Sequence, residues 1–474
     1  MRISPLLPKP NSFLAILILA VGTAVAVALI PEEVQPKAAL FWPSLALAVA
    51  LGGVPIWISI QEPKRLFEAQ HLLVLAPIYW LLLDSLQKVY DLEGISHREA
   101  VLAFVSIALF TFGVWLGVMG RSWPIPRLVH EAASMEVTSN TLFTISVMAF
   151  LLGMGKFAIP CGFDISVMLK ALMANRWEAP WCRGALGGWN AFSDALQYFG
   201  YLLPAVTVTL ASRLGWLNTR TIGSLLMAVI MTVFMAQEGG RRNVGVMVGM
   251  AIICWVLMNK RVKSRQLTMI VVMCGLLLWL MQTMLTYRNT GFQSLVSAEE
   301  RQAIEKRDYI HVDDNFYRLC QIVQFIPRDH PFVHGKFITY VLVRPIPRVF
   351  WPGKPTDAGF DIAEEQGLKG VSLSISVVGE MYMSGGLLAV LLGGWFYGRL
   401  AGMANQLLAQ TKKIGAVILY GTMTMALFAG MRSFIDLILI SYVIIAWVIL
   451  SRMYQMAFGG SQTRLLAKKN RKAA

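Results

Sequence analysis

Charge is scarce in this sequence. Asp, Glu, Lys and Arg make up 15% of its 474 residues, whereas soluble domains carry roughly 25%. Apolar residues make up 56%, and the mean hydropathy is +0.58. This balance excludes an ordinary soluble protein and predicts an all-α polytopic membrane protein.

Cysteine is also scarce, with 5 residues in the chain, which excludes a disulfide-rich scaffold. Cys161 and Cys182 share one loop, where a disulfide and two free thiols are both compatible with the sequence. No Cys-x-x-Cys pair or His-rich tract is present, and the spacing of His311, His330 and His334 imposes no ligand set. No metal site is therefore predicted.

The sequence lacks the short motifs of common hydrolases, dehydrogenases and nucleotide-binding enzymes, namely GxSxG, GxGxxG after a strand, the P-loop and HExxH. No cofactor is therefore expected. The glycine pairs 239–240 and 385–386 fall at or within apolar segments. There, small residues more often permit close helix packing than bind phosphate.

Long apolar windows are abundant, and their length suits a hydrocarbon core of roughly 30 Å. We predict about twelve transmembrane helices, since backbone groups in lipid must bond within their own segment. The first window ends at Pro31 without a clear cleavage site, so we interpret it as a retained span. The windows lie near 11–30, 38–60, 70–87, 99–119, 139–158, 197–211, 219–236, 244–258, 267–287, 375–398, 414–430 and 434–451.

The distribution of charge predicts the orientation. With the N-terminus in the cytoplasm, half of the 42 Lys and Arg residues fall on the cytoplasmic side. The acids on that side are few: Glu62, Glu68, Glu131 and Glu136. The net charge of +15 therefore belongs to the cytoplasmic face, where it suits anionic lipid rather than nucleic acid. Both termini are predicted to be cytoplasmic.

Two loops are longer than simple connections. Loop 159–196 is predicted to carry an amphipathic helix at the membrane interface, with Trp177 and Trp181 in the headgroup layer. Loop 288–374 is predicted to be the main extracytoplasmic domain. The predicted organisation is a membrane domain at 1–287, this loop domain at 288–374, a second membrane domain at 375–451 and a basic cytoplasmic tail at 452–474.

Cations gather at the predicted outer face, against the positive-inside tendency. Guanidinium groups bind phosphate oxygens through two parallel hydrogen bonds and stay charged at any working pH. We therefore predict an anion-binding ring that comprises Arg241, Arg242, Arg288, Arg344, Arg348, Lys354 and Arg432. Ion pairs are the alternative: Glu238 with one of the two adjacent arginines, and Asp436 with Arg432 across a helical turn.

Three acids are candidates for contact with substrate. Glu380 opens an apolar span, where partial desolvation would make its carboxylate a usable proton acceptor. The alternative is a carboxylate that interacts with the helix dipole. Asp313 and Asp314, which precede Asn315 in the large loop, are predicted to bind sugar hydroxyls or a cation. The alternative for both is simple solvation.

Residues 344–355 read Arg-Pro-Ile-Pro-Arg-Val-Phe-Trp-Pro-Gly-Lys-Pro, and residues 379–382 read Gly-Glu-Met-Tyr at the start of a span. Together with a Gly-Gly-Arg-Arg turn at 239–242, these segments resemble the Wzy-type O-antigen polymerases, which join oligosaccharide repeat units in bacterial envelopes. The Gly-Gly-Arg-Arg turn at 239–242 is similar to the family's small-residue-then-Arg motif, although a single Arg is common there. The resemblance covers about 240–400; residues 1–230 match only in hydropathy and topology.

The resemblance implies a GT-C-like glycosyltransferase of the bacterial inner membrane. It would move a growing glycan from polyprenyl pyrophosphate onto a new lipid-linked repeat unit. The arginines would stabilise the pyrophosphate, Glu380 would take a proton from the attacking hydroxyl, and Tyr382 would contact sugar. The implied partners are the lipid-linked oligosaccharide, the bilayer and a chain-length regulator, with no nucleic acid.

Three other functions fit parts of the sequence. An O-antigen ligase would use the same lipid carrier but a different acceptor. A lipid-linked oligosaccharide transporter or flippase usually has two similar halves and charges at mid-membrane, whereas these halves differ. A non-enzymatic scaffold of polysaccharide assembly would be expected to have a degenerate charge cluster.

Overall fold

The structure is a computed structural model, and it describes residues 12–89, 91–182, 184–259, 264–287, 290–292, 309–343, 346–355, 358–368 and 373–473. These residues form helices and turns, and no β-strand occurs among them. They divide into two compact units. Unit 1 comprises Met1–Pro124, Glu305–Ala409 and Met423–Leu439, and unit 2 comprises Ile125–Ile304, Gln410–Thr422 and Ile440–Ala474.

Nine helices in the described residues are long and apolar enough to cross a membrane, which agrees with the predicted polytopic all-α class. One of them, Ala69–Gln87, is built from three consecutive segments: α3 (Ala69–Pro77), η2 (Ile78–Leu82) and α4 (Leu83–Gln87). The other eight are α2 (Phe41–Gln61), α5 (His97–Met119), α7 (Ser139–Ala158), α11 (Thr219–Gln237), α12 (Arg241–Met258), α13 (Ser264–Tyr287), α18 (Ser376–Asn405) and α20 (Phe434–Ala473).

Three of the twelve predicted windows differ from these nine. Two helices, α1 (Ser12–Ala28) and α19 (Ile414–Gly430), have 17 residues each and are shorter than the nine. The window 197–211 is not one helix, because α9 (Asn190–Gly200) ends and α10 (Leu203–Leu214) begins within it. Pro204 lies in the first turn of α10, where its missing N–H costs no hydrogen bond and a new helix can begin.

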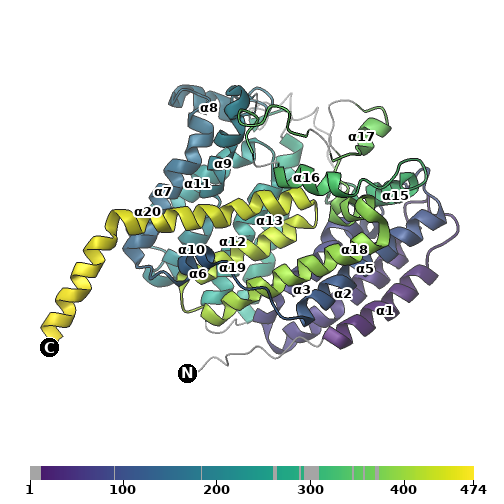
Figure 1. The fold of residues 1–474 in the computed structure, drawn as a ribbon, viewed down its shortest axis with the longest axis horizontal. Coiled ribbons are helices and arrows are strands. Elements are labelled where there is room, and N and C mark those ends of the chain that lie inside the picture. Colours follow the sequence, from purple (N-terminus) through teal and green to yellow (C-terminus); the bar gives the residue numbers. More distant parts are fainter. Residues whose placement is uncertain are drawn as a thin grey trace. The chain divides into compact units, whose positions relative to one another are not determined.

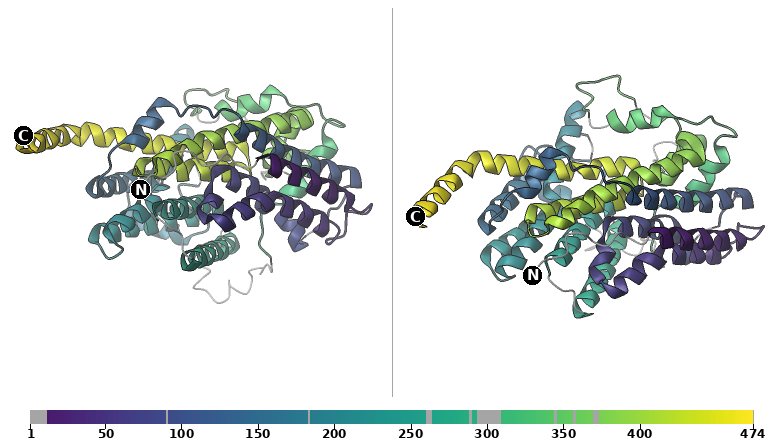
Figure 2. Two further views of the ribbon diagram at one scale, coloured as in Figure 1. Left: turned by 90° about the horizontal axis from the view of Figure 1, so that it is seen from below. Right: turned by 60° about the horizontal axis from the view of Figure 1, so that its bottom comes forward.

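In unit 1, the helices α1 and α2 at the start of the chain lie side by side in Figure 1 and in both views of Figure 2.

Shorter elements connect the long helices. The remaining elements are η1 (Pro63–Phe67), α6 (Arg127–Ser134), α8 (Ile165–Met173), η3 (Gly187–Trp189), α15 (Asn315–Phe325), α16 (Gly335–Val343), α17 (Ile362–Glu365) and η5 (Gln406–Gln410).

Glycines bring α5 and α18 into backbone contact in unit 1, where the two helices run alongside each other (Figure 1). A Cβ added to Gly394 would collide with the Phe110 carbonyl oxygen, and one added to Gly398 would collide with that of Val114. Small residues four apart on a membrane helix permit this close approach. The contact therefore depends on the absence of side chains at these positions.

The same contact defines the relative direction of α5 and α18. A Cβ on Gly113 would lie 2.8 Å from the backbone nitrogen of Trp395, and one on Gly117 would lie 2.9 Å from the backbone nitrogen of Arg399. Residue numbers thus rise together along both helices, so α5 and α18 are parallel. Their first residues lie toward one end of the pair and their last residues toward the other.

A glycine pair interrupts α18. Gly385 and Gly386 leave helical geometry, and Gly386 has φ 65°, a conformation that glycine adopts without penalty. The carbonyls that lose their helical partners are satisfied from outside the helix: the N–H groups of Val333 and His334 donate to Met383 and Ser384 at 2.9 and 3.1 Å. Instead of permitting close helix packing, as expected, the pair separates Ser376–Ser384 from the long remainder of α18.

In unit 2, α8 lies in loop 159–196. It exposes Ile165 and Leu169 and buries Met168 and Ala171. The exposed residues are apolar as well, so the placement of an amphipathic helix at the membrane interface stays a prediction.

The prediction for Trp181 is wrong. Trp177 is 62% exposed, but Trp181 is 7% exposed and packs edge-on against Phe157 and Phe234. Its indole N–H donates to the Gln237 side-chain oxygen at 3.0 Å. Trp181 is buried because the end of α7 and the end of α11 supply both aromatic contacts and an acceptor.

Candidate functional site

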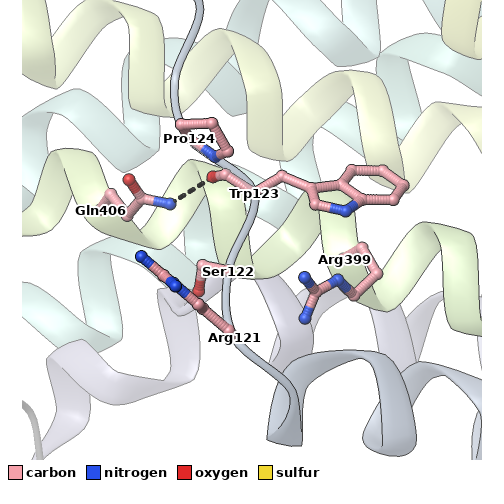
Figure 3. Close-up of a pocket in the computed structure, with 6 residues that line it drawn as sticks. All are labelled: Arg121, Ser122, Trp123, Pro124, Arg399 and Gln406. Carbon is pink, nitrogen blue, oxygen red and sulfur yellow. Dashed lines mark hydrogen bonds between the residues drawn. The ribbon is translucent and has the colours of Figure 1, made fainter.

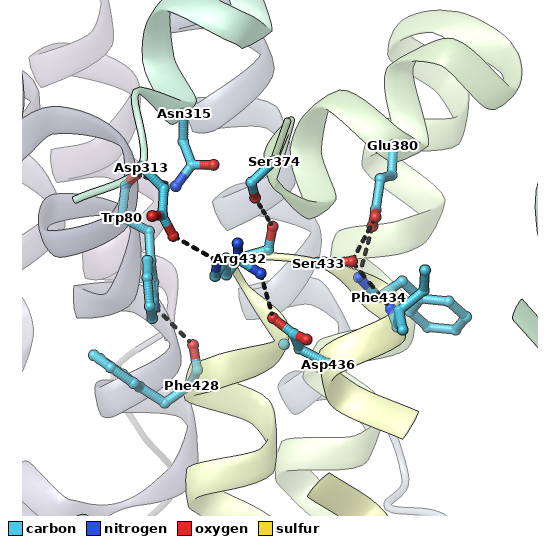
Figure 4. A network of polar contacts seen from close by, with 12 residues as sticks. Trp80, Asp313, Asn315, Ser374, Glu380, Phe428, Arg432, Ser433, Phe434 and Asp436 are labelled. Carbon is cyan, nitrogen blue, oxygen red and sulfur yellow. Dashed lines mark hydrogen bonds and ion pairs between the residues drawn. The ribbon is translucent and has the colours of Figure 1, made fainter. Parts of the chain in front are cut away.

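Arg432 lies at the centre of a charged cluster in unit 1, in the turn between α19 and α20 (Figure 4). Its Nε is 2.5 Å from an Asp313 oxygen, and its Nη1 is 3.1 Å from an Asp436 oxygen. The Asp436 side chain is 3% exposed, whereas those of Arg432 and Asp313 are 26% and 24% exposed. Molecules outside the unit can therefore reach the Asp313 side of the cluster.

An unusual backbone conformation precedes α15 and positions Asp313. Asp313 and Asp314 have φ 94° and 51°, the left-handed region that non-glycine residues adopt at a cost and that is frequent at functional sites. The next residue, Asn315, is buried and donates to the Trp80 carbonyl at 3.0 Å. The Trp80 indole donates to the Phe428 carbonyl at 3.0 Å. The loop is thereby attached to the π-helical segment η2 and to the end of α19.

Glu380 joins α18 to the start of α20. One carboxylate oxygen accepts from the Ser433 hydroxyl and the other from the Phe434 N–H, both at 2.6 Å (Figure 4). The residue is 6% exposed. A carboxylate at a helix N-terminus satisfies a free N–H group and interacts favourably with the helix dipole. The helix that Glu380 caps is α20, whereas the sequence alternative named the dipole of its own helix.

The balance of charge restricts what this cluster can bind. Burial opposes the charge on Arg432, but the neighbouring Asp313 and Asp436 carboxylates raise its pKa above the ordinary value. The ion pair with Asp436, which the sequence offered as the alternative, is present. Two carboxylates share one guanidinium, and Glu380 lies beside them. The cluster is thus suited to hydroxyl groups or a cation, and poorly suited to a pyrophosphate anion.

The other sequence-predicted residues of unit 1 lie outside this cluster. Asp314 faces Arg318 at 3.8 Å and His311 at 4.0 Å. Tyr382 is buried, with its ring 6.5 Å from that of Phe332, so sugar would have to displace packing to reach it.

The proline-rich segment presents its cations at an exposed turn. Arg348 is exposed, and Lys354 donates from Nζ to the Ile346 carbonyl at 2.8 Å. Phe350 is 71% exposed beside them. Arg288 and Arg344, two further members of the predicted ring, lie outside the described residues.

Arg241 and Arg242 belong to unit 2, where they form the first turn of α12. The preceding Gly239 has φ 70°, a left-handed turn position where glycine is favoured. Because the predicted ring draws on both units, it remains a prediction. The neighbouring Glu238 pairs with Lys156, its Oε1 2.5 Å from the Lys156 Nζ.

Lys156 is the charged residue that the sequence analysis missed. It is 5% exposed near the end of α7, and its Nζ lies 3.7 Å from Asp194 and 3.1 Å from the Gln197 side-chain oxygen. Burial raises the pKa of Asp194, while Lys156 opposes that rise. A lysine inside an apolar window was the available signal, since buried intramembrane charges require partners.

The two cysteines of loop 159–196 are free thiols. Burial raises the pKa of Cys182 to about 11 and also raises the pKa of Cys161. Both thiols therefore remain protonated at neutral pH, where a thiol is a weak nucleophile.

In the described part of the chain, no group of three or more His, Cys, Asp and Glu residues could hold a metal ion. Comparison with family models, curated proteins and solved structures finds no match to the chain. Functional inference therefore depends on the geometry of unit 1 and on the sequence motifs.

Proposed function

We propose that the chain is a membrane glycosyltransferase that polymerises oligosaccharide repeat units carried on polyprenyl pyrophosphate. The observation that carries the proposal is the meeting of Asp313, Glu380 and Arg432 in one cluster. These three residues come from a loop, a helix start and a turn that are far apart in the sequence. The helical membrane architecture and the proline-rich basic motif support the same proposal.

In the proposed reaction, the hydroxyl oxygen of the acceptor sugar attacks the anomeric carbon of the donor glycan. The bond from that carbon to the pyrophosphate oxygen breaks, and its electron pair leaves with the pyrophosphate. The hydroxyl proton passes to a carboxylate, and we assign this role to Asp313 because it is the more accessible acid of the cluster. Arg432 orients that carboxylate.

Glu380 is assigned as a positioning residue in this proposal, in place of the base role that the sequence suggested. Both of its oxygens accept hydrogen bonds from the start of α20, and little of it is exposed. It acts through the turn that carries Arg432. The developing charge on the pyrophosphate is assigned to cations outside this cluster, with Arg348 and Lys354 as the described candidates in unit 1.

Orientation in the bacterial inner membrane is part of the proposal. With both termini in the cytoplasm, a cysteine at Arg328 (64% exposed) should react with an impermeant thiol reagent added to intact spheroplasts. A cysteine at Arg127 (91% exposed) should react only after lysis. Both are to be made in a variant without the native cysteines, and the opposite labelling pattern would reject the topology.

The function itself is tested by deleting the gene and separating the surface glycans by gel electrophoresis. Polymerase activity predicts loss of long chains with retention of single-repeat material. Loss of all ligated material would identify a ligase. Reconstitution with lipid-linked repeat units should produce a ladder of polymer lengths, whereas a flippase would move the units without joining them.

A further inference from the structure

A basic site lies in unit 1, at the opposite ends of α5 and α18 from Glu380. A cavity of about 520 Å³ is lined by Arg121, Ser122, Trp123, Pro124, Arg399 and Gln406 (Figure 3). The first four residues follow α5, and the last two lie on α18 and η5. Because α5 and α18 are parallel, this cavity forms where both helices end.

Arg399 is held in place by its neighbours. Its guanidinium carbon is 5.5 Å from the centre of the Trp123 ring and 5.8 Å from that of Trp395, within cation–π range. A Cβ on Gly120 would lie 2.5 Å from Arg399 Nη1. The Gln406 amide donates to the Trp123 carbonyl at 2.5 Å, which fixes the segment that carries this indole. The guanidinium is thus ordered before any ligand binds.

Part of the hydrogen-bonding capacity of the cavity is unused. Arg399 Nε is buried without an acceptor in the described part of the chain, and such a donor costs free energy unless something satisfies it. The lining contains two guanidinium groups and no carboxylate. Among the described residues, no acid lies within ion-pair distance of Arg121 or Arg399. Figure 3 shows these side chains on either side of the segment that carries Ser122.

We propose that this cavity is a phosphate-binding site. Two planar guanidinium groups bind phosphate oxygens with bidentate geometry. The volume falls in the range of ligand pockets, roughly 300–1,000 Å³, and accommodates a group larger than a bare ion. The predicted orientation places it at the cytoplasmic face, where basic pockets between helices bind anionic lipid headgroups. The proposal is independent of the glycosyltransferase function, since it uses none of those residues.

The test is the thermal stability of the purified full-length chain in neutral detergent, titrated with phosphatidylglycerol, with diacylglycerol, which lacks phosphate, or with inorganic phosphate. Phosphatidylglycerol should raise the Tm at concentrations where diacylglycerol does not. Arg121→Gln and Arg399→Gln should each increase the phosphatidylglycerol concentration that gives half of this Tm rise by about tenfold or more. This is the loss of affinity expected when a charged hydrogen-bonding group is removed. Arg121 is exposed, so its variant is expected to fold normally.

Arg127→Gln is the matched control, because Arg127 is 91% exposed and pairs with Glu131 outside the cavity. It should respond to phosphatidylglycerol like the unmodified chain. A stronger response to inorganic phosphate, also lost in Arg399→Gln, would assign the site to a soluble phosphate ligand. Equal responses to phosphatidylglycerol and diacylglycerol, or unchanged responses in both cavity variants, would overturn the proposal.

Discussion

Replacing Asp313 with Asn is expected to slow polymer formation by about 10²–10⁴-fold, the usual contribution of a general base. Asn keeps an oxygen that can accept from Arg432 Nε, but the amide cannot take up a proton. The rate is to be measured with reconstituted protein and lipid-linked repeat units. Binding of the donor should change little, because the pyrophosphate is assigned to other residues.

Asp436→Asn is the matched control for this prediction. It also removes one carboxylate from Arg432, but Asp436 is buried beneath the guanidinium and cannot reach a substrate. Its effect should appear mainly in stability, with a rate close to that of the unmodified chain. Equal losses of rate in the two variants would mean that the cluster is purely structural.

Glu380→Gln completes the comparison. Gln can accept from the Phe434 N–H through its oxygen and donate to the Ser433 hydroxyl through its amide, so both contacts of the native carboxylate survive. A positioning role therefore predicts less than about a tenfold change in rate, with a larger loss in Glu380→Ala. A hundredfold loss of rate in Glu380→Gln, together with a near-normal rate in Asp313→Asn, would reverse the assignment and make Glu380 the base.

Replacing Gly394 with Ala is expected to destabilise unit 1 by about 3 kcal/mol or more. Overpacking a core usually costs about 1–3 kcal/mol, and here the added methyl group meets the carbonyl of Phe110, which cannot rotate away like a side chain. The helices α5 and α18 would have to separate. The measurement is the midpoint of thermal unfolding in detergent, which is monitored as the loss of the monodisperse peak in size-exclusion chromatography.

Gly275→Ala provides the control within the same chain. Gly275 lies in α13, where an added Cβ meets no atom within 4 Å. Because Ala is the better helix former by roughly 1 kcal/mol, this variant should be at least as stable as the native chain. If both substitutions had the same effect, the close contact of α5 and α18 would not be what stabilises unit 1.

Hydropathy predicted the helical class because nine windows satisfy the length requirement of the bilayer without help from their neighbours. It failed at 197–211, where a proline begins a new helix inside an apolar run. The amphipathic pattern of loop 159–196 failed for Trp181, because spacing along the chain does not reveal a partner as distant as Phe234. Residue type alone indicated an indole at the interface, but tertiary contacts buried it.

The candidate site was predictable as a set of residues, but their roles were not. Arg432, Asp313 and Glu380 stood out as charges beside apolar segments. Whether a guanidinium is available for phosphate depends on its partners, and Asp313 lies more than a hundred residues from Arg432 in the chain. Similarly, the hydrogen bonds that Ser433 and Phe434 donate to the carboxylate of Glu380 can be recognised only in three dimensions.

The parallel contact between α5 and α18 also has a consequence for biogenesis. At about 5–20 residues per second, the ribosome needs on the order of 10–50 s to proceed from Met119 at the end of α5 to Ser376 at the start of α18. Throughout that interval, Gly113 and Gly117 lack the helix against which they finally pack. The contact between α5 and α18 can therefore form only after the intervening helices of unit 2 have been translated.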